Sequence, residues 1–209
     1  MFLLLHEFAP RLAARTLQDR VRVHEVTLLS DNWYTLKTTA FDWRRSDGSW
    51  QRMHRETYDR GNGATLLAYN RARRTVLLTR QFRYPAFVNG WDDLLIEAAA
   101  GLLDNAAPEE RIRAEVEEEL GYRLGAVHKV FECFMSPGSV TEKLHFFVAE
   151  YEPSMRVGAG GGLAEEGEDI EVLEFGIDEA LAMVADGRIA DAKTILLLYH
   201  ARLHLFAPG

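Results

Sequence analysis

Three acidic side chains near the middle of the sequence are spaced so that one helix would bring them together. Glu115, Glu118 and Glu119 fall within an arc of about 100° when the surrounding segment is drawn as an α-helix. Like charges this close repel by about a few tenths of a kcal/mol per pair, and by more beside a buried surface. A cation such as Mg²⁺, which takes carboxylates together with substrate phosphates, would offset the repulsion. The spacing indicates either such a metal site or a solvated acidic face with Arg111 as its local partner.

The helix that would carry these glutamates is predicted over residues 108–120. Pro108 suits the first helical position, Glu109 and Glu110 favour the positive end of the helix dipole, and Gly121 favours termination. An apolar stripe adjoins the glutamates and consists of Ile112, Val116 and Leu120. The carboxylates therefore converge beside the buried edge of the helix, while Glu117 points to solvent.

The elements that must position this helix are predicted to be a mixture of strands and helices. Further strands are expected at residues 64–69, 75–82, 94–96, 126–135, 143–151 and 170–175. Two further helices are expected at residues 177–186 and 191–204. This order predicts an α/β fold in which helices pack on a layered sheet.

The N-terminal part of the sequence has a different pattern. Three strands are expected at residues 21–29, 33–43 and 49–58, with a hairpin signal at Ser46-Asp47-Gly48. Such a small antiparallel β-meander has little core of its own, so it must pack on the rest of the chain or on a second copy. The expected organisation is an N-terminal extension over 1–20, the meander over 21–60 and a catalytic domain over 61–209.

Composition restricts the class of protein. The formal net charge of −8 disfavours nucleic acid as a partner, because binding to phosphate backbones needs clustered Lys and Arg. Cys133 is the single cysteine, so the chain forms no internal disulfide, which fits a cytoplasmic location. The apolar run at the start is too short for a secretory signal, and no stretch approaches the roughly 18–20 apolar residues of a membrane span.

The glutamates lie in a segment with a distinctive order, Ala100-Gly101-Leu102-Leu103-Asp104-Asn105 followed by Glu115-Val116-Glu117-Glu118-Glu119-Leu120-Gly121-Tyr122. This segment resembles the Nudix box, in which a glycine-started loop leads into Arg-Glu-apolar-x-Glu-Glu-x-Gly-apolar. Three positions depart from the pattern. Ala100 replaces the first glycine, Ala106 a loop glutamate, and Ala114 the arginine that helps to hold the box glutamates, although Arg113 is adjacent.

The resemblance runs from about residue 28 to 198 and is closest to the GDP-mannose pyrophosphatase branch of the Nudix family, near the ADP-ribose pyrophosphatases. Its landmarks outside the box are Tyr58-Asp59-Arg60-Gly61-Asn62-Gly63-Ala64, Arg80-Gln81-Phe82-Arg83, Met135-Ser136-Pro137-Gly138-Ser139-Val140-Thr141-Glu142, Ala159-Gly160-Gly161-Gly162, Glu168-Asp169-Ile170-Glu171-Val172 and Ala192-Lys193-Thr194. It implies a Nudix-type α/β/α sandwich with a mixed sheet, and a homodimer that exchanges the N-terminal strands.

The resemblance also implies a set of site residues. The metal ligands would be Glu115, Glu119, Glu168 and the backbone carbonyl of Ala100. The catalytic residues would be Glu142, as a general base in a mobile loop, and Glu118, as a further ligand or a support for metal-bound water. Arg83 and Lys193 would contact phosphate or sugar oxygens, and Trp33 the base. The remaining substrate contacts would be Gly101, Leu102 and, reaching from the partner subunit, His54, Arg55 and Glu56.

Some of these residues admit plainer interpretations. Without the resemblance, Glu142 would be interpreted as an ordinary surface glutamate. Trp33 would be interpreted equally well as a packing residue or as a platform for the base. The glycine-rich segment over residues 157–169 invites a phosphate-loop reading, but no helix and no Lys-Ser/Thr pair follow it. We expect instead a flexible loop that carries the carboxylates of Glu165, Glu166 and Glu168 to the metal.

The function implied by the resemblance is hydrolysis of the diphosphate of a nucleotide-sugar, dependent on Mg²⁺, with Mn²⁺ as a substitute. The expected reaction converts GDP-mannose to GMP and mannose 1-phosphate. The alternative within the enzyme class is an ADP-ribose pyrophosphatase that gives AMP and ribose 5-phosphate. The alternative from another class is a Nudix module that binds a nucleotide-sugar without cleaving it, against which the intact Glu115, Glu118 and Glu119 argue.

Overall fold

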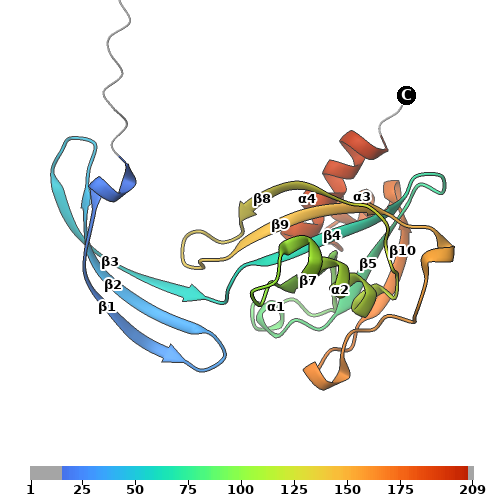
Figure 1. Cartoon of the computed structure of the whole chain (residues 1–209), viewed down its shortest axis with the longest axis horizontal. Coiled ribbons are helices and arrows are strands. Elements are labelled where there is room, and N and C mark those ends of the chain that lie inside the picture. Colours follow the sequence, from blue (N-terminus) through green and yellow to red (C-terminus); the bar gives the residue numbers. More distant parts are fainter. Residues whose placement is uncertain (1–15, 207–209) are drawn as a thin grey trace, which may run out of the picture. The chain divides into compact units, whose positions relative to one another are not determined.

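The computed structural model describes residues 16–206, which form two compact units that divide between Asp59 and Arg60 (Figure 1). Residues 1–15 of the expected N-terminal extension lie outside the described residues; of the remainder, Leu17–Arg20 form a short 3-10 helix, η1. Within residues 16–206, no helix is both long and apolar enough to cross a membrane.

The N-terminal unit is an antiparallel sheet of three strands in the order β1-β2-β3, which confirms the predicted meander. The strands are β1 (Val21–Asp31), β2 (Thr35–Arg44) and β3 (Trp50–Asp59). The predicted hairpin turn has Gly48 at a positive φ of 88°, and Asp47 accepts a hydrogen bond from the Ser49 amide at 2.9 Å. None of the residues described in this unit is buried, so the sheet has no core of its own.

The larger unit is built on a mixed sheet in the order β10-β5-β4-β9-β8, with β6 beside β5 and β7 beside β4. Its strands are β4 (Gly63–Asn70), β5 (Thr75–Gln81), β6 (Leu95–Glu97), β7 (Ala99–Leu102), β8 (Val127–Phe134), β9 (Lys143–Glu150) and β10 (Glu171–Gly176). The central strand β4 pairs in parallel with β9 and antiparallel with β5 and β7. All eight of its residues are buried, as expected for a strand covered on both faces.

Helices cover both faces of this sheet (Figure 1). They are α1 (Tyr84–Val88), α2 (Pro108–Leu120), α3 (Ile177–Ala185) and α4 (Ala192–His200), and α4 continues into a π-helical turn over Ala201–Leu205. Side chains of β4 alternate between two cores: Leu66 and Ala68 pack with α2, and Leu67 and Tyr69 pack with α3 and α4. The layers are therefore helix, sheet, helix, and the predicted α/β/α sandwich is confirmed.

Two elements differ from the sequence prediction. Strand β7 carries Ala-Ala-Gly, residues that β-strands do not favour, and it forms because β4 supplies a partner along its length. Helix α1 has only five residues and begins around Pro85, so it is too short for a helical repeat of apolar positions to be visible.

Candidate active site

Helix α2 has the bounds predicted from its sequence, and its packing sets the positions of the glutamates. Gly121 ends it in the left-handed conformation with φ 76°, and the apolar stripe of Ile112, Val116 and Leu120 is fully buried. Because Glu115 and Glu119 adjoin that stripe, they are only 6% and 2% exposed. Glu117 points outward and pairs with Arg123 at 2.5 Å. The predicted orientation of the helix is confirmed.

Glu119 is a buried carboxylate on which the charges of the neighbouring glutamates act. Burial, followed by the charges of Glu115 and Glu168, raises the pKa of Glu119 to about 8. One of its carboxylate oxygens accepts a 3.3 Å hydrogen bond from the Ala100 amide in β7. The fold thus gathers three predicted ligand carboxylates and the Ala100 peptide around one buried position.

Two glycines make room for these carboxylates. A Cβ on Gly101 would lie 1.7 Å from an oxygen of Glu115, and a Cβ on Gly162 would lie 2.4 Å from an oxygen of Glu168. Neither position could carry a side chain while the carboxylate stays in place. Gly101, predicted as a substrate contact, therefore has a clear steric role beside Glu115.

The glycine-rich segment packs closely against the end of helix α2, whereas its sequence predicts a flexible loop. The amides of Gly161 and Gly162 donate to the carbonyls of Glu119 and Glu118 at 2.9 and 3.2 Å. A Cβ on Gly160 would lie 2.4 Å from the Glu119 carbonyl. These bonds satisfy carbonyl groups at the end of α2 that lack helical partners. The segment then leads to Glu168, whose carboxylate accepts from the Leu163 amide at 2.9 Å.

The donor chemistry around Glu119 fits a hard divalent cation. Among the side chains of residues 16–206, no group of three or more acidic, histidine or cysteine residues is already arranged as a metal-ligand set. However, the side-chain donors are carboxylate oxygens, and the pKa of Glu119 is raised by burial and then by repulsion from Glu115 and Glu168, both of which a bound cation would offset. Glu115, Glu119, Glu168 and the Ala100 carbonyl are the residues that could hold it.

The two arginines of α2 point in different directions. Arg111 pairs with Glu115 at 2.5 Å and donates to the Leu102 carbonyl at 3.1 Å. Arg113 instead donates to the carbonyls of Leu124 and Gly125 and pairs with Glu109. Its position next to Ala114 in the sequence therefore does not bring Arg113 to the glutamates.

A second group of charges lies beside the carboxylates. Arg83 and Lys193 donate to the two oxygens of the Glu97 carboxylate, at 2.8 and 2.7 Å. The charge of Glu119 acts on Arg83 as well, so this guanidinium lies within electrostatic range of both acidic groups. Lys193 also pairs with Asp191 at 3.0 Å and is only 8% exposed. Two of the three Lys193 donors are thus used within the protein, whereas Arg83 is half-exposed and open to a ligand.

The pKa values follow from these pairings. Burial would raise the pKa of Glu97, but the charges of Lys193 and Arg83 outweigh it and hold that pKa below its ordinary value. Burial would likewise lower the pKa of Lys193, yet Glu97 and Asp191 raise it. All three groups therefore stay charged inside the fold at neutral pH.

Sequence reasoning missed Glu97 and Asp191. The available signals were a glutamate between apolar neighbours in the short strand β6 and an aspartate three residues before Thr194. Asp191 caps α4 by accepting from the Thr194 amide at 3.0 Å. The Thr194 hydroxyl in turn accepts from the Ala98 amide at 2.6 Å, which ties α4 to the β6–β7 junction.

Glu142 lies just before β9 and is largely shielded from solvent. Its carboxylate is 3.6 Å from the Arg60 guanidinium, and 13% of its side chain is exposed. An oxygen of Glu142 and the carbonyl oxygen of Gly101 both lie within 4 Å of the point where a Cβ on Gly63 would stand. Glu142 is therefore close to the start of β4, where that strand pairs with the end of β7.

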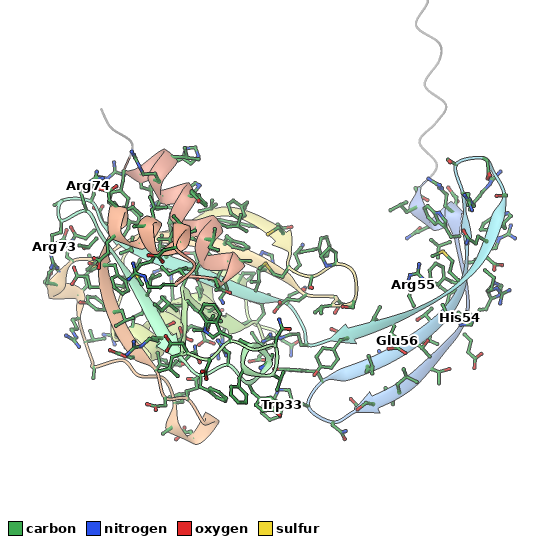
Figure 2. The ribbon with its side chains drawn as sticks, turned by 180° about the vertical axis from the view of Figure 1, so that it is seen from behind. Trp33, His54, Arg55, Glu56, Arg73 and Arg74 are labelled. Carbon is green, nitrogen blue, oxygen red and sulfur yellow. The ribbon has the colours of Figure 1, made fainter. Side chains whose placement is uncertain are left out.

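The other predicted contacts belong to the N-terminal unit (Figure 2). Trp33 is 82% exposed in the β1–β2 turn, with its ring edge-on to Tyr34. His54, Arg55 and Glu56 are exposed on β3, where alternation puts His54 and Glu56 on one face and Arg55 on the other. These residues are free to meet another surface, and their roles remain predictions.

Two arginines of the basic turn between β4 and β5 are paired with carboxylates. Figure 2 shows Arg73 and Arg74 at this turn. Arg73 pairs with Glu174 at 2.9 Å and Arg74 with Asp178 at 3.2 Å. Their charges are matched by neighbouring carboxylates.

Comparison with known proteins agrees with this geometry. Residues 20–58 match the family described as GDP-mannose pyrophosphatase NudK N-terminal domain. The GDP-mannose pyrophosphatase of Pectobacterium atrosepticum is 57% identical over 191 residues, which cover 90% of this chain and 98% of that protein. The Klebsiella pneumoniae protein of the same name is 52% identical over 86% of this chain and 90% of its own length.

A solved structure supports the fold independently. The crystal structure of an ADP compounds hydrolase aligns with a TM-score of 0.69 over 92% of this chain and 97% of that chain, at 16% sequence identity. At that identity the likeness concerns the fold alone. The two relatives above half identity show that this chain belongs to the GDP-mannose pyrophosphatase family of Nudix hydrolases.

Proposed function

We propose that this hydrolase cleaves the diphosphate of GDP-mannose with water, giving GMP and mannose 1-phosphate. The observation that carries the proposal is the buried Glu119, whose pKa is raised by burial and by the carboxylates of Glu115 and Glu168. Such a cluster is suited to a cation and, through it, to a diphosphate. The names of the relatives supply the choice of nucleotide-sugar.

The metal would be held by the carboxylates of Glu115, Glu119 and Glu168 and by the Ala100 carbonyl, with Glu118 as a further ligand or a support for bound water. Mg²⁺, or Mn²⁺ in its place, supplies charge neutralisation and a more acidic water when bound. The protein contributes the fixed geometry, because Gly101 and Gly162 leave room for two of the carboxylates.

The remaining residues bind substrate and move a proton. Glu142 accepts a proton from the attacking water at its carboxylate, which lies close to the start of β4. Arg83, oriented by Glu97, donates to a phosphate oxygen from its exposed side. Lys193 acts mainly through Glu97, since two of its donors are used there and on Asp191. The backbone of Gly101 and Leu102 pairs with that part of β4.

The N-terminal unit is proposed to complete the site in a homodimer. Its sheet exposes apolar side chains on β1, among them Val23, Val26 and Leu28 at 60%, 56% and 55%. A sheet with no buried described residue gains stability by covering such a face. Trp33 would then contact the base, and His54, Arg55 and Glu56 would reach the partner's substrate. A mass of two chains by light scattering is expected; a monomer at micromolar concentration would contradict this.

We also propose that the enzyme is cytoplasmic, because its substrate class and its single thiol, Cys133, fit that reducing compartment. Fractionation of cells that produce the protein tests this location.

The test of function is a product assay by chromatography. The purified chain with Mg²⁺ receives GDP-mannose, ADP-ribose and a dinucleotide diphosphate in parallel reactions. Preferential release of GMP and mannose 1-phosphate is expected. Release of AMP from ADP-ribose faster than release of GMP from GDP-mannose would reassign the substrate. Binding of a nucleotide-sugar without any cleavage would favour the alternative of a non-catalytic binding module.

A further inference from the structure

Arg111 makes two contacts that join separate parts of the site. Its guanidinium pairs with the Glu115 carboxylate at 2.5 Å, and its Nε donates to the Leu102 carbonyl at 3.1 Å. Glu115 lies on the same helix, four residues away, whereas Leu102 ends strand β7. A single planar group therefore bridges α2 and β7.

The bridge spans a place where the two elements approach each other closely. Gly101, next to Leu102, faces Glu115 so closely that a Cβ there would overlap the carboxylate. One residue further back in β7 is Ala100, whose amide donates to Glu119. Arg111 thus fixes a carboxylate of the helix relative to the strand that carries the Ala100 peptide.

No other arginine of α2 has this arrangement. Arg113 is bonded to the Leu124 and Gly125 carbonyls, away from the glutamates, and Ala114 has no donor in its side chain. Arg111 is also well shielded, with 26% of its side chain exposed. A shielded, planar guanidinium that contacts both Glu115 and Leu102 holds the carboxylate in one orientation better than a mobile ammonium does.

We propose that Arg111 is the positioning residue of the metal site, holding the Glu115 carboxylate over Gly101 of β7. This inference rests on the ligand assignment made under the proposed function. The positive charge of Arg111 by itself opposes a cation, so its benefit is orientation. Removal of the side chain is therefore expected to weaken metal binding, although the net charge of the site becomes more negative.

The experiment measures Mn²⁺ and Mg²⁺ binding to the full chain by calorimetry, without substrate, for wild type, R111A, R111K and R113A. The R111A variant is expected to raise the metal Kd by about tenfold, as for other groups that orient a ligand. R111K keeps the charge but lacks the planar fork, so it should recover only part of the affinity. R113A is the matched control and should bind like wild type. Metal affinity in both Arg111 variants equal to or tighter than that of wild type would overturn the proposal.

Two further readouts separate the causes of failure. Thermal unfolding in EDTA shows whether each variant folds; if R111A does not, the R111K Kd decides. Hydrolysis of GDP-mannose by wild type tests the proposed function separately. If wild type does not hydrolyse GDP-mannose but the metal Kd of R111K is raised, the proposed substrate is refuted and the role of Arg111 is supported. Normal hydrolysis by wild type with an unchanged metal Kd in every Arg111 variant that folds refutes the role of Arg111 alone.

Discussion

The ammonium group of Lys193 lies 2.7 Å from one oxygen of the buried Glu97 carboxylate. The other oxygen of that carboxylate accepts from Arg83 at 2.8 Å. One acidic group therefore neutralises a buried cation and orients a half-exposed one. The pair joins α4 to β6, so it links the C-terminal helices to the site around Glu119.

Removing this carboxylate charge should destabilise the fold. Glu97→Gln leaves Lys193 buried with Asp191 alone, and we expect the free energy of unfolding to fall by about 3 kcal/mol. Urea unfolding measures the change. The matched control is Glu171→Gln, an exposed partner of Arg80, which should change stability by less than about 1 kcal/mol. Equal effects of the two substitutions would contradict the buried role of Glu97.

The same pair predicts how stability depends on pH. The pKa of Glu97 is lowered from its ordinary value of 4.5, because Lys193 and Arg83 outweigh the effect of burial. The unfolded chain therefore takes up this proton at higher pH than the folded chain. The stabilisation is fully present above pH 4.5 and is lost as pH falls through the lower folded pKa. The stability difference between wild type and Glu97→Gln should shrink below that pH; a constant difference in urea unfolding would contradict the assignment.

Glu119→Gln tests the metal assignment by separating stability from activity. Without metal, burial and the charges of Glu115 and Glu168 raise the pKa of Glu119 to about 8, so at neutral pH folding must protonate a carboxyl that is ionised in the unfolded chain. Glutamine removes this cost, so the melting temperature in EDTA at pH 7 should rise. Mg²⁺ at about a hundredfold excess over Kd should stabilise wild type by about 2.7 kcal/mol and the variant by much less. Turnover should be abolished. Glu117→Gln on the exposed face is the control, and full activity in Glu119→Gln would remove Glu119 from the site.

Gly101→Ala tests the close approach of β7 to α2. The new Cβ would overlap the Glu115 carboxylate, so either the carboxylate or the strand must move. A displacement of about 1 Å can cost about a hundredfold in rate, and we expect a loss of that size in kcat/KM. Gly125→Ala is the control, because a Cβ there has no neighbour within 4 Å. Activity of Gly101→Ala within about twofold of wild type would show that Glu115 can move without loss.

Several features of this protein could be read from short stretches of sequence. Helix α2 has the predicted bounds because Pro108, Gly121 and the apolar stripe act locally. The three strands of the N-terminal unit and most strands of the larger sheet end within about two residues of their predicted limits, since alternation and turn residues are also local signals. The convergence of Glu115 and Glu119 follows from helical geometry alone.

The motifs that resemble the Nudix family allowed further predictions about the site. They predicted which backbone and acidic groups would face a metal; in the structure Ala100 donates to Glu119, and the charges of Glu115 and Glu168 act on Glu119. Strand β7 was missed because its residues have low strand propensity and it depends on β4.

The sequence by itself therefore determined the helix, its carboxylates and the alternation of the sheets. Only the tertiary structure decided which charges meet. Glu97 and Lys193 are 96 residues apart, and Ala100 and Glu119 are 19 apart. It also showed that the glycines of the acidic loop dock against α2, and that Arg111 rather than Arg113 holds Glu115. These contacts depend on packing between distant segments, whereas propensities and caps act within a few residues.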